Sequence, residues 1–277
     1  MALTNFIPEV WSKKLLKTFD ENAVMAGLVN RDYEGDIQAA GDTVKVRTYG
    51  DVTINNYTRD MSISFQSLTD PMQEMNIDQQ KYFAFKVDDL DKAQADMNIL
   101  EGYTSRAAIG IRNVIDSHLL AHHGDVDSGN VIGTDGSPIS LTSSNIYGYI
   151  ADLGELLDSS NIPSDERNLV ITPAVKTLLL KSEEFTRATG LGDQVIQNGY
   201  IGNVAGFGVH VSTNLSPVSG VVNLMAFTKD FISFASQVSQ VEHVRPYNMF
   251  ADAVKGLYLY GSKVFHPTAG AILKASA

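Results

Sequence analysis

The feature that most constrains the fold of this chain is one long helical pattern over residues 96–124. Apolar side chains recur there at spacings of three and four residues, which places them on one stripe of a single helix. The stripe consists of Leu100, Tyr103, Ala107, Ile111, Val114 and His118. Polar side chains lie on another face, at Asn98, Glu101, Ser105, Arg112 and Asp116. Because Ile109 falls among these polar positions, we expect both sides of the helix to be covered.

The ends of this helix are also marked in the sequence. Asp96 is a suitable N-cap, Glu101 favours the first turns, and Gly124 is a suitable stop. A helix over residues 96–123 would be a rod of about 42 Å, at about 1.5 Å per residue. A compact domain of this size seldom needs so long a helix, so we expect a spine of the fold rather than a surface helix.

The N-terminal residues 6–19 form a short amphipathic pattern that begins near Pro8. Trp11, Leu15 and Phe19 share one face, and the lysines of the segment lie elsewhere. Two interpretations remain open from the residues alone. The segment is either a helix docked on its own core or an arm docked on another subunit.

A strand pattern begins at residue 43, where Val44 and Val46 alternate with charged residues. Residues 49–69 are polar and turn-rich, without a strong apolar face, and alternation returns at Met75 and Ile77. We therefore expect a long two-stranded excursion. Such a ribbon is marginally stable alone, and a long loop without its own core is usually functional. A neighbouring surface is its natural stabiliser, which indicates assembly.

The rest of the chain mixes helix and strand patterns, and the helix–strand–helix order over residues 144–185 indicates one α/β unit. No internal repeat, coiled-coil heptad or low-complexity tract is present. We expect helices at 144–159 and 173–185 and strands at 167–172, 207–213, 221–227, 231–235, 238–244 and 257–265, with an interruption at 246–254, a glycine-rich segment at 187–199 and a small apolar C-terminal tail.

Composition excludes several classes of protein. The 277 residues suffice for one large domain or two modest ones. Zero cysteines exclude disulfides, thiolate metal sites and cysteine nucleophiles, which fits assembly in a cytoplasm. No apolar run approaches the roughly 18–20 residues that span a bilayer. The N-terminus also lacks the basic and then apolar pattern of a signal peptide, so we expect no membrane partner.

The formal net charge of −11 bears on nucleic-acid binding. It argues against tight, nonspecific binding, because phosphate contacts need clustered Lys and Arg. It does not argue against enclosing nucleic acid, because a container should repel its cargo weakly.

The search for catalytic and ligand motifs yields no site. His118 and His122 share a helix face, but the general-base Glu of a zinc peptidase is missing between them. Histidines near a helix C-terminus also interact favourably with its partial negative charge. Residues 256–263 only approach a phosphate-binding loop, because Ser262 precedes Lys263 and no helix follows. We expect no catalytic, cofactor-binding or metal-binding residues.

Two stretches of the chain resemble a known family. Residues 6–46, FIPEVWSKKLLKTFDENAVMAGLVNRDYEGDIQAAGDTVKV, resemble the opening of tailed-bacteriophage major capsid (coat) proteins. Residues 199–215, GYIGNVAGFGVHVSTNL, resemble a glycine-punctuated segment that many of these proteins carry. The resemblance implies the α+β Hong Kong 97-type fold, which consists of an N-terminal arm, an extended hairpin loop, a peripheral domain with a long spine helix, and an axial domain of mixed sheet and helices. It implies an N-terminal arm at 1–42, an extended loop at 43–82, a peripheral domain at 83–135 and 236–277 with spine helix 96–123, and an axial domain at 136–235.

The resemblance further implies a structural protein rather than an enzyme. Such a subunit forms hexamers and pentamers of an icosahedral shell around double-stranded DNA, and it resides in the virion capsid after assembly in the host bacterial cytoplasm. The implied partners are further copies of the chain, a separate scaffolding protein, a portal protein and, optionally, a decoration protein. The candidate contact residues between subunits are Trp11, Leu15 and Phe19 in the arm, Asn55, Asn56, Tyr57, Arg59 and Asp60 in the loop, and Gly190 and Gly192 near the axis of a ring.

The chain departs from some relatives in two respects. Residues 46–80 contain no lysine, so the covalent crosslink that some relatives form through an extended-loop lysine is not expected. No long charged helical extension precedes the arm, which indicates a separate scaffolding protein. Two alternatives stay open: a non-viral, encapsulin-like cage of the same fold, and a soluble α/β enzyme or ligand-binding protein.

Overall fold

The computed structural model describes residues 24–33, 43–47, 52–57, 59, 65–67, 72–88, 99–183, 202–215, 217–246 and 250–276. The expected arm helix at 6–19 and the expected N-cap Asp96 lie outside this part of the chain. So do the candidate contact residues Trp11, Leu15, Phe19, Asp60, Gly190 and Gly192.

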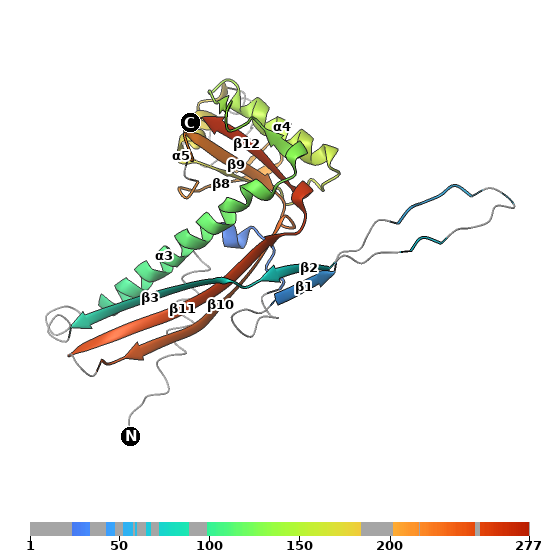
Figure 1. Ribbon diagram of the computed structural model, residues 1–277. Helices are drawn as coiled ribbons and strands as arrows, with labels where there is room; N and C mark the ends of the chain where they lie inside the picture. The colour runs from blue at the N-terminus through green and yellow to red at the C-terminus, as the bar shows by residue number, and fades with distance from the viewer. Residues whose placement is uncertain are drawn as a thin grey trace.

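A long antiparallel sheet of three strands forms one half of the molecule (Figure 1). Its strand order is β10 (Ile232–Val244), β11 (Ala251–Val264), β3 (Gln79–Asp88). The strands expected separately at 231–235 and 238–244 are one strand, β10, which has a register shift between Val238 and Gln240. The expected interruption at 246–254 is shorter, because β11 already begins at Ala251.

The long helix α3 (Ile99–Leu120) runs alongside this sheet, and the 3-10 turn η3 (Ala121–Asp125) continues it (Figure 1). The long helix is therefore confirmed, but its expected buried face is wrong. Tyr103 is 53% exposed and Val114 is 41% exposed, whereas Asp116, expected on the polar face, is only 2% exposed. Within residues 102–120, the part of α3 whose side chains the structure describes, the buried apolar side chains are Ala108, Ile115, Leu119 and Leu120.

The buried stripe of α3 is thus rotated by about one residue, or about 100°, from the stripe expected from spacing. The physical reason lies in the sheet. Phe83 and Phe85 project from β3 and pack in one cluster with Ala108, Val241 and Val254. Bulky aromatic rings on the sheet require small side chains on the facing side of the helix.

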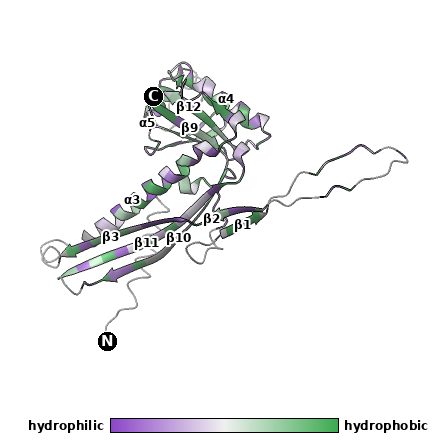
Figure 2. Ribbon diagram, viewed as in Figure 1, coloured by the Kyte–Doolittle hydropathy of each residue, from purple (hydrophilic) through white to green (hydrophobic). Residues whose placement is uncertain are grey.

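A second, mixed sheet of seven strands forms the other half of the molecule. It runs β4-β12-β9-β6-β8-β7, with β5 also paired to β12. Its strands are β4 (Val131–Ile132), β5 (Ile139–Ser140), β6 (Asn168–Ile171), β7 (Asn203–Val204), β8 (Phe207–Val211), β9 (Val221–Phe227) and β12 (Gly270–Ser276). Figure 2 shows that its central strands are mainly hydrophobic, as expected where both faces are covered.

The C-terminal residues do not form the expected tail. They form β12, which pairs antiparallel with β9 and parallel with β4 and β5. The domain division expected from the sequence assigned residues 236–277 to the peripheral domain, together with the long helix. The strand pairing of β12 places residues 270–276 in the seven-stranded sheet. The run of small and apolar residues fits a central strand, because such strands read as nearly continuous apolar sequence.

Two helices pack with the seven-stranded sheet. The helix expected at 144–159 is confirmed as α4 (Ile146–Ser159), and the helix expected at 173–185 is α5 (Pro173–Leu180), which ends five residues earlier. Thr172 caps α5, since its Oγ1 accepts a hydrogen bond of 3.3 Å from the Val175 N–H. Three short 3-10 turns complete the described structure, η1 (Met25–Gly27), η4 (Ser128–Asn130) and η5 (Pro267–Ala269).

A hairpin projects far from both halves of the molecule (Figure 1). Its base is formed by β1 (Thr43–Arg47) and β2 (Met72–Asn76), which pair antiparallel, so the expected two-stranded excursion is confirmed there. The base packs on the three-stranded sheet through Val44, Met75 and Ile77, which form a cluster with Leu259 and Phe265. We call residues 43–76 the extended hairpin.

Candidate inter-subunit contact surfaces

The tip of the extended hairpin exposes large apolar side chains. Ile54 and Phe65 are each 95% exposed, and Val52 and Tyr57 are also mostly exposed. The Thr53 N–H donates to Gln66 Oε1 at 2.8 Å, which bridges the two arms of the hairpin. Water-exposed apolar side chains on a thin ribbon indicate a contact surface, because the ribbon has no core in which to bury them.

Two of these side chains lie on opposite arms of the hairpin. Ile54 follows Thr53 on one arm and Phe65 precedes Gln66 on the other, and the Thr53–Gln66 hydrogen bond joins the two arms beside them. Both arms therefore contribute to the exposed apolar surface.

The candidate loop residues lie in the same region. Asn55, Asn56, Tyr57 and Arg59 are all exposed in the part of the hairpin that the structure describes. The sequence interpretation missed Ile54 and Phe65, because it found no strong apolar face over residues 49–69. The available signal was the presence of single large apolar residues within a polar, turn-rich stretch.

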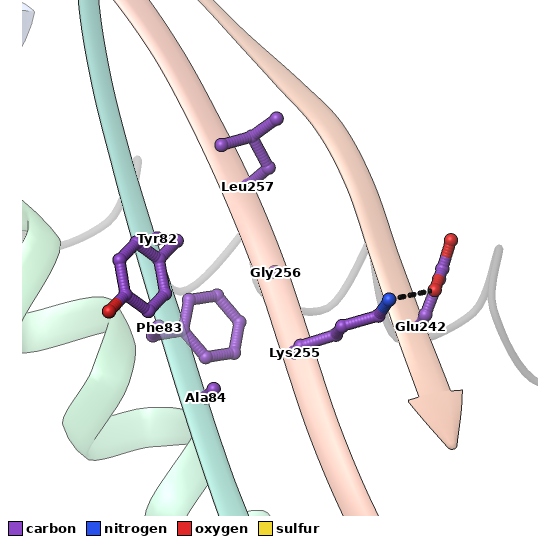
Figure 3. A pocket seen from close by; sticks show the side chains of 7 residues that line it. All are labelled: Tyr82, Phe83, Ala84, Glu242, Lys255, Gly256 and Leu257. Atoms are coloured by element: carbon purple, nitrogen blue, oxygen red, sulfur yellow. Dashed lines mark ion pairs between the residues drawn. The ribbon is translucent and has the colours of Figure 1, made fainter.

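The three-stranded sheet carries a groove of about 400 Å³ (Figure 3). Tyr82, which is 82% exposed, lies opposite Leu257 on the neighbouring strand. Toward β10, Lys255 Nζ of β11 and Glu242 Oε2 of β10 form an ion pair with 2.7 Å between the two atoms. The groove is lined by Tyr82, Phe83, Ala84, Glu242, Lys255, Gly256 and Leu257. The groove therefore has apolar lining residues and one charged edge, formed by the Lys255–Glu242 pair. Such a surface can bind a segment in which an apolar side chain is flanked by polar ones.

A second hollow of about 390 Å³ continues along the same sheet. Its lining residues are Ala84, Phe85, Lys86, Val244, Ala253, Val254 and Lys255. Phe250 also exposes its ring to solvent, between β10 and β11 in the sequence. The sheet therefore offers an extended apolar surface rather than one isolated pocket.

A buried carboxylate joins three parts of the molecule. Asp116 on α3 accepts a hydrogen bond of 3.3 Å from the Met25 N–H and one of 3.4 Å from Asn214 Nδ2. Burial raises the pKa of Asp116, and the backbone N–H of Met25, the charge of Arg112 and the amide of Asn214 partly counteract this rise. Sequence reasoning placed Asp116 on the polar face of the helix, and no local signal in the sequence marks its two partners.

The histidines at the end of α3 make contacts within the subunit. His122 Nδ1 lies 2.6 Å from Asp125 Oδ2, and its Nε2 lies 2.7 Å from Ser262 Oγ on β11. The ring of His118 packs edge-on against Tyr260, with 5.2 Å between the ring centroids. Within the described residues, no three potential ligands come close enough together to hold a metal ion. The histidines therefore connect α3 to the three-stranded sheet.

His118 makes the stability of this junction dependent on pH. Burial lowers its pKa, the charges of His122 and Lys81 lower it further, and Asp78 raises it. A lowered pKa in the folded state means that stability is fully present above about 6.5, the unfolded value, and is lost as the pH falls through the folded-state value. We expect the melting temperature of the protein to fall between about pH 7.5 and pH 5 by about 1–3 °C more than that of His118→Gln.

Differential scanning calorimetry across this pH range measures the effect. His266→Gln is the matched control, because His266 is exposed at the surface. Parallel pH profiles for the wild type and His118→Gln would show that His118 does not contribute.

No helix in the described part of the chain combines the length and the apolar character that crossing a membrane requires. A long helix beside a three-stranded sheet, a projecting hairpin and a second mixed sheet together define the Hong Kong 97-type fold of capsid shell proteins, as expected from the sequence.

Comparisons with known proteins agree with this class. The family model described as phage capsid protein matches residues 72–273, so the chain belongs to the phage capsid protein family. The resemblance to tailed-phage major capsid proteins is thereby confirmed. The family and the fold indicate a structural rather than a catalytic protein. No curated protein matches the sequence.

Solved structures show the same fold at low sequence identity. A chain from Mycobacterium phage Che8 is 24% identical, with a TM-score of 0.75, over 98% of this chain and 93% of the other. A chain from the capsid of cyanophage P-SCSP1u is 16% identical, with a TM-score of 0.71, over 90% and 86%. A virus-like particle from Pyrococcus furiosus is 13% identical, with a TM-score of 0.60, over 97% and 99%.

Proposed function

We propose that this chain is the major capsid protein of a tailed phage, which assembles into hexamers and pentamers of an icosahedral shell around double-stranded DNA. The observation that best supports this proposal is the extended hairpin. Its tip exposes Ile54 and Phe65, and among the described residues no other element lies beside it (Figure 1). A second copy of the subunit supplies the missing surface.

We propose that the tip packs on the three-stranded sheet of a neighbouring subunit. The groove beside Tyr82 and Leu257 supplies the apolar surface, and the Lys255–Glu242 pair supplies polar partners for Asn55 and Arg59. The contact is non-covalent, since residues 46–80 contain no lysine. Glycines 190 and 192 lie near the axis where the subunits of one ring meet.

The subunit then divides into functional parts. We propose an arm at 1–42, an extended loop at 43–82, a peripheral domain at 83–135 with 236–269, and an axial domain at 136–235. Residues 270–277 join the axial domain in this proposal, because β12 pairs with β9.

The shell assembles in the cytoplasm of the host bacterium and becomes the virion capsid. A separate scaffolding protein directs its curvature, a portal protein occupies one vertex, and a decoration protein is an optional outer partner. The net charge of −11 suits a container that encloses DNA without sequence-specific binding.

Electron microscopy of the purified protein tests the proposal directly. The chain is produced alone and together with the proposed scaffolding protein, and the products are separated by size-exclusion chromatography. Closed particles under either condition support the proposal. A compact monomer under every condition, with the scaffolding protein included, contradicts it.

A non-viral cage of the same fold is the second candidate function. The full-length match to the virus-like particle from Pyrococcus furiosus favours it. The content of particles isolated from the native source separates the two candidates, because a phage head contains a double-stranded DNA genome and a cage contains a cargo protein.

Removal of residues 5–19 tests the role of the arm. We expect the shortened subunit to remain folded, with an unchanged circular dichroism spectrum, but to form at least about tenfold fewer particles, because the apolar face with Trp11, Leu15 and Phe19 is lost. Particle yield by sedimentation measures this effect. Normal yield with unchanged thermal stability of the particles would show that the arm does not contact a neighbour.

A further inference from the structure

Three segments that are far apart in the sequence meet at the side chain of Asp116. The carboxylate lies on α3 and is 2% exposed. It accepts hydrogen bonds from the backbone N–H groups of Val24 and Met25 and from the side-chain amide of Asn214. Val24 and Met25 open the first described segment, and Asn214 lies in the loop after β8 of the seven-stranded sheet.

The segment that begins at Val24 is fixed at two points. At its start, the carboxylate of Asp116 receives the N–H groups that open the turn η1, as an N-cap does for a helix. At its end, Asn30 accepts from the Phe234 N–H at 2.8 Å and donates to the Ile232 carbonyl at 3.0 Å. Between these points, Met25 and Ala26 are buried in the main core with Ile115 and Leu119. Asp116 therefore holds the start of the described segment that begins at Val24.

The third partner connects this point to the other half of the molecule. Asn214 Nδ2 donates both to Asp116 and to Asn113 Oδ1, which lies one turn earlier on α3. The Oδ1 atom of Asn113 also accepts a hydrogen bond from the guanidinium of Arg112. The loop that carries Asn214 is itself ordered, since the Asn214 N–H donates to Ser212 Oγ at 3.1 Å. A shift of this loop relative to α3 would change the hydrogen bonds that Asp116 makes.

We propose that Asp116 is a joint that anchors residues 24–27 to α3 and couples this anchor to the seven-stranded sheet through Asn214. Movement of this sheet against α3 is transmitted to residues 24–27. A buried carboxylate suits this role, because it can accept several hydrogen bonds at once and because its partners are costly to leave unpaired. The inference concerns a single subunit and does not depend on the proposed function.

Hydrogen–deuterium exchange of the full-length protein tests the joint. We expect Asp116→Ala to speed exchange at residues 24–27 by about tenfold or more, because their N–H groups lose a buried acceptor. Asp116→Asn keeps an acceptor oxygen of the same size, so exchange should stay within about threefold of the wild type. Ser117→Ala, at the exposed neighbouring position, should change nothing.

The coupling is tested with Asn214→Ala. We expect this variant to speed exchange at residues 24–27 by about threefold or more, although its side chain donates to α3 rather than to that segment. If Asp116→Ala exchanges like Ser117→Ala, no anchoring exists and the proposal is overturned. If Asn214→Ala exchanges like Ser117→Ala at residues 24–27, the coupling is overturned. If Asp116→Ala does not yield folded protein, the exchange rate of Asn214→Ala at residues 24–27 tests the proposal alone.

Discussion

Replacing the exposed pair at the tip of the extended hairpin, Ile54→Ser with Phe65→Ser, should abolish shell assembly while leaving the subunit folded. Both side chains are 95% exposed in the single subunit, so their loss removes no contact that stabilises the fold. In the assembled shell they would be buried against a neighbour. Burying one such side chain is worth about 1.5–3 kcal/mol, so the double change should cost about 3 kcal/mol or more per contact.

Such a loss raises the subunit concentration required for assembly by about a hundredfold or more, since every 1.4 kcal/mol is about a factor of ten. Light scattering during assembly and electron microscopy of the products measure this shift. Thermal unfolding of the unassembled subunit should be unchanged within about 1 °C.

The matched control keeps the apolar character of both positions. Ile54→Val with Phe65→Leu should assemble at nearly the wild-type concentration, whereas Ser67→Ala, a polar change in the same hairpin, should have no effect. On the receiving surface, Tyr82→Ser should weaken assembly as the tip variant does, because Tyr82 borders the groove of the three-stranded sheet. Normal shells from the Ile54→Ser, Phe65→Ser variant would refute the proposed contact.

Periodicity predicted those elements whose burial pattern is set by their own residues. The strand at 221–227 and the helix ending at Ser159 have one clear apolar pattern each, and the structure confirms both. The face of α3 could not be predicted in this way, because two stripes of equal spacing compete on it. Phe83 and Phe85 select one of the two stripes, because their rings pack against the small side chain of Ala108. This contact joins strands to a helix, and the sequence does not indicate that these elements lie side by side.

The contact surfaces required still more distant information. Ile54 and Phe65 contribute to one surface only because Thr53 and Gln66 join the two arms of the hairpin, and Asp116 becomes a buried acceptor only when Met25 and Asn214 come together on α3. The sequence alone predicted the position of Asn55, Tyr57 and Arg59 in an exposed hairpin, because polar turn residues are typical of a hairpin tip. This signal does not depend on the direction in which the hairpin projects.

The root of the extended hairpin should tolerate no side chain at Gly261. Gly261 lies on β11, opposite Ala235 of β10. A Cβ atom there would clash with the Asn76 carbonyl oxygen and would lie only 3.0 Å from the Ile77 Cα, both in the backbone that connects β2 to β3. Backbone cannot move aside as a side-chain tip can, so we expect Gly261→Ala to lower the free energy of unfolding by about 3 kcal/mol.

Gly256→Ala is the matched control for this change, because it is the same substitution on the same strand. The atoms that a Cβ would meet at Gly256 belong only to the ring of Phe83, a side chain that can shift more readily than backbone. We therefore expect a loss of only about 1 kcal/mol there. Urea unfolding with an unchanged slope compares the two variants. Equal stability of Gly261→Ala and Gly256→Ala would contradict the argument, whereas the expected difference would show that the direction of the hairpin is fixed by backbone packing at its root.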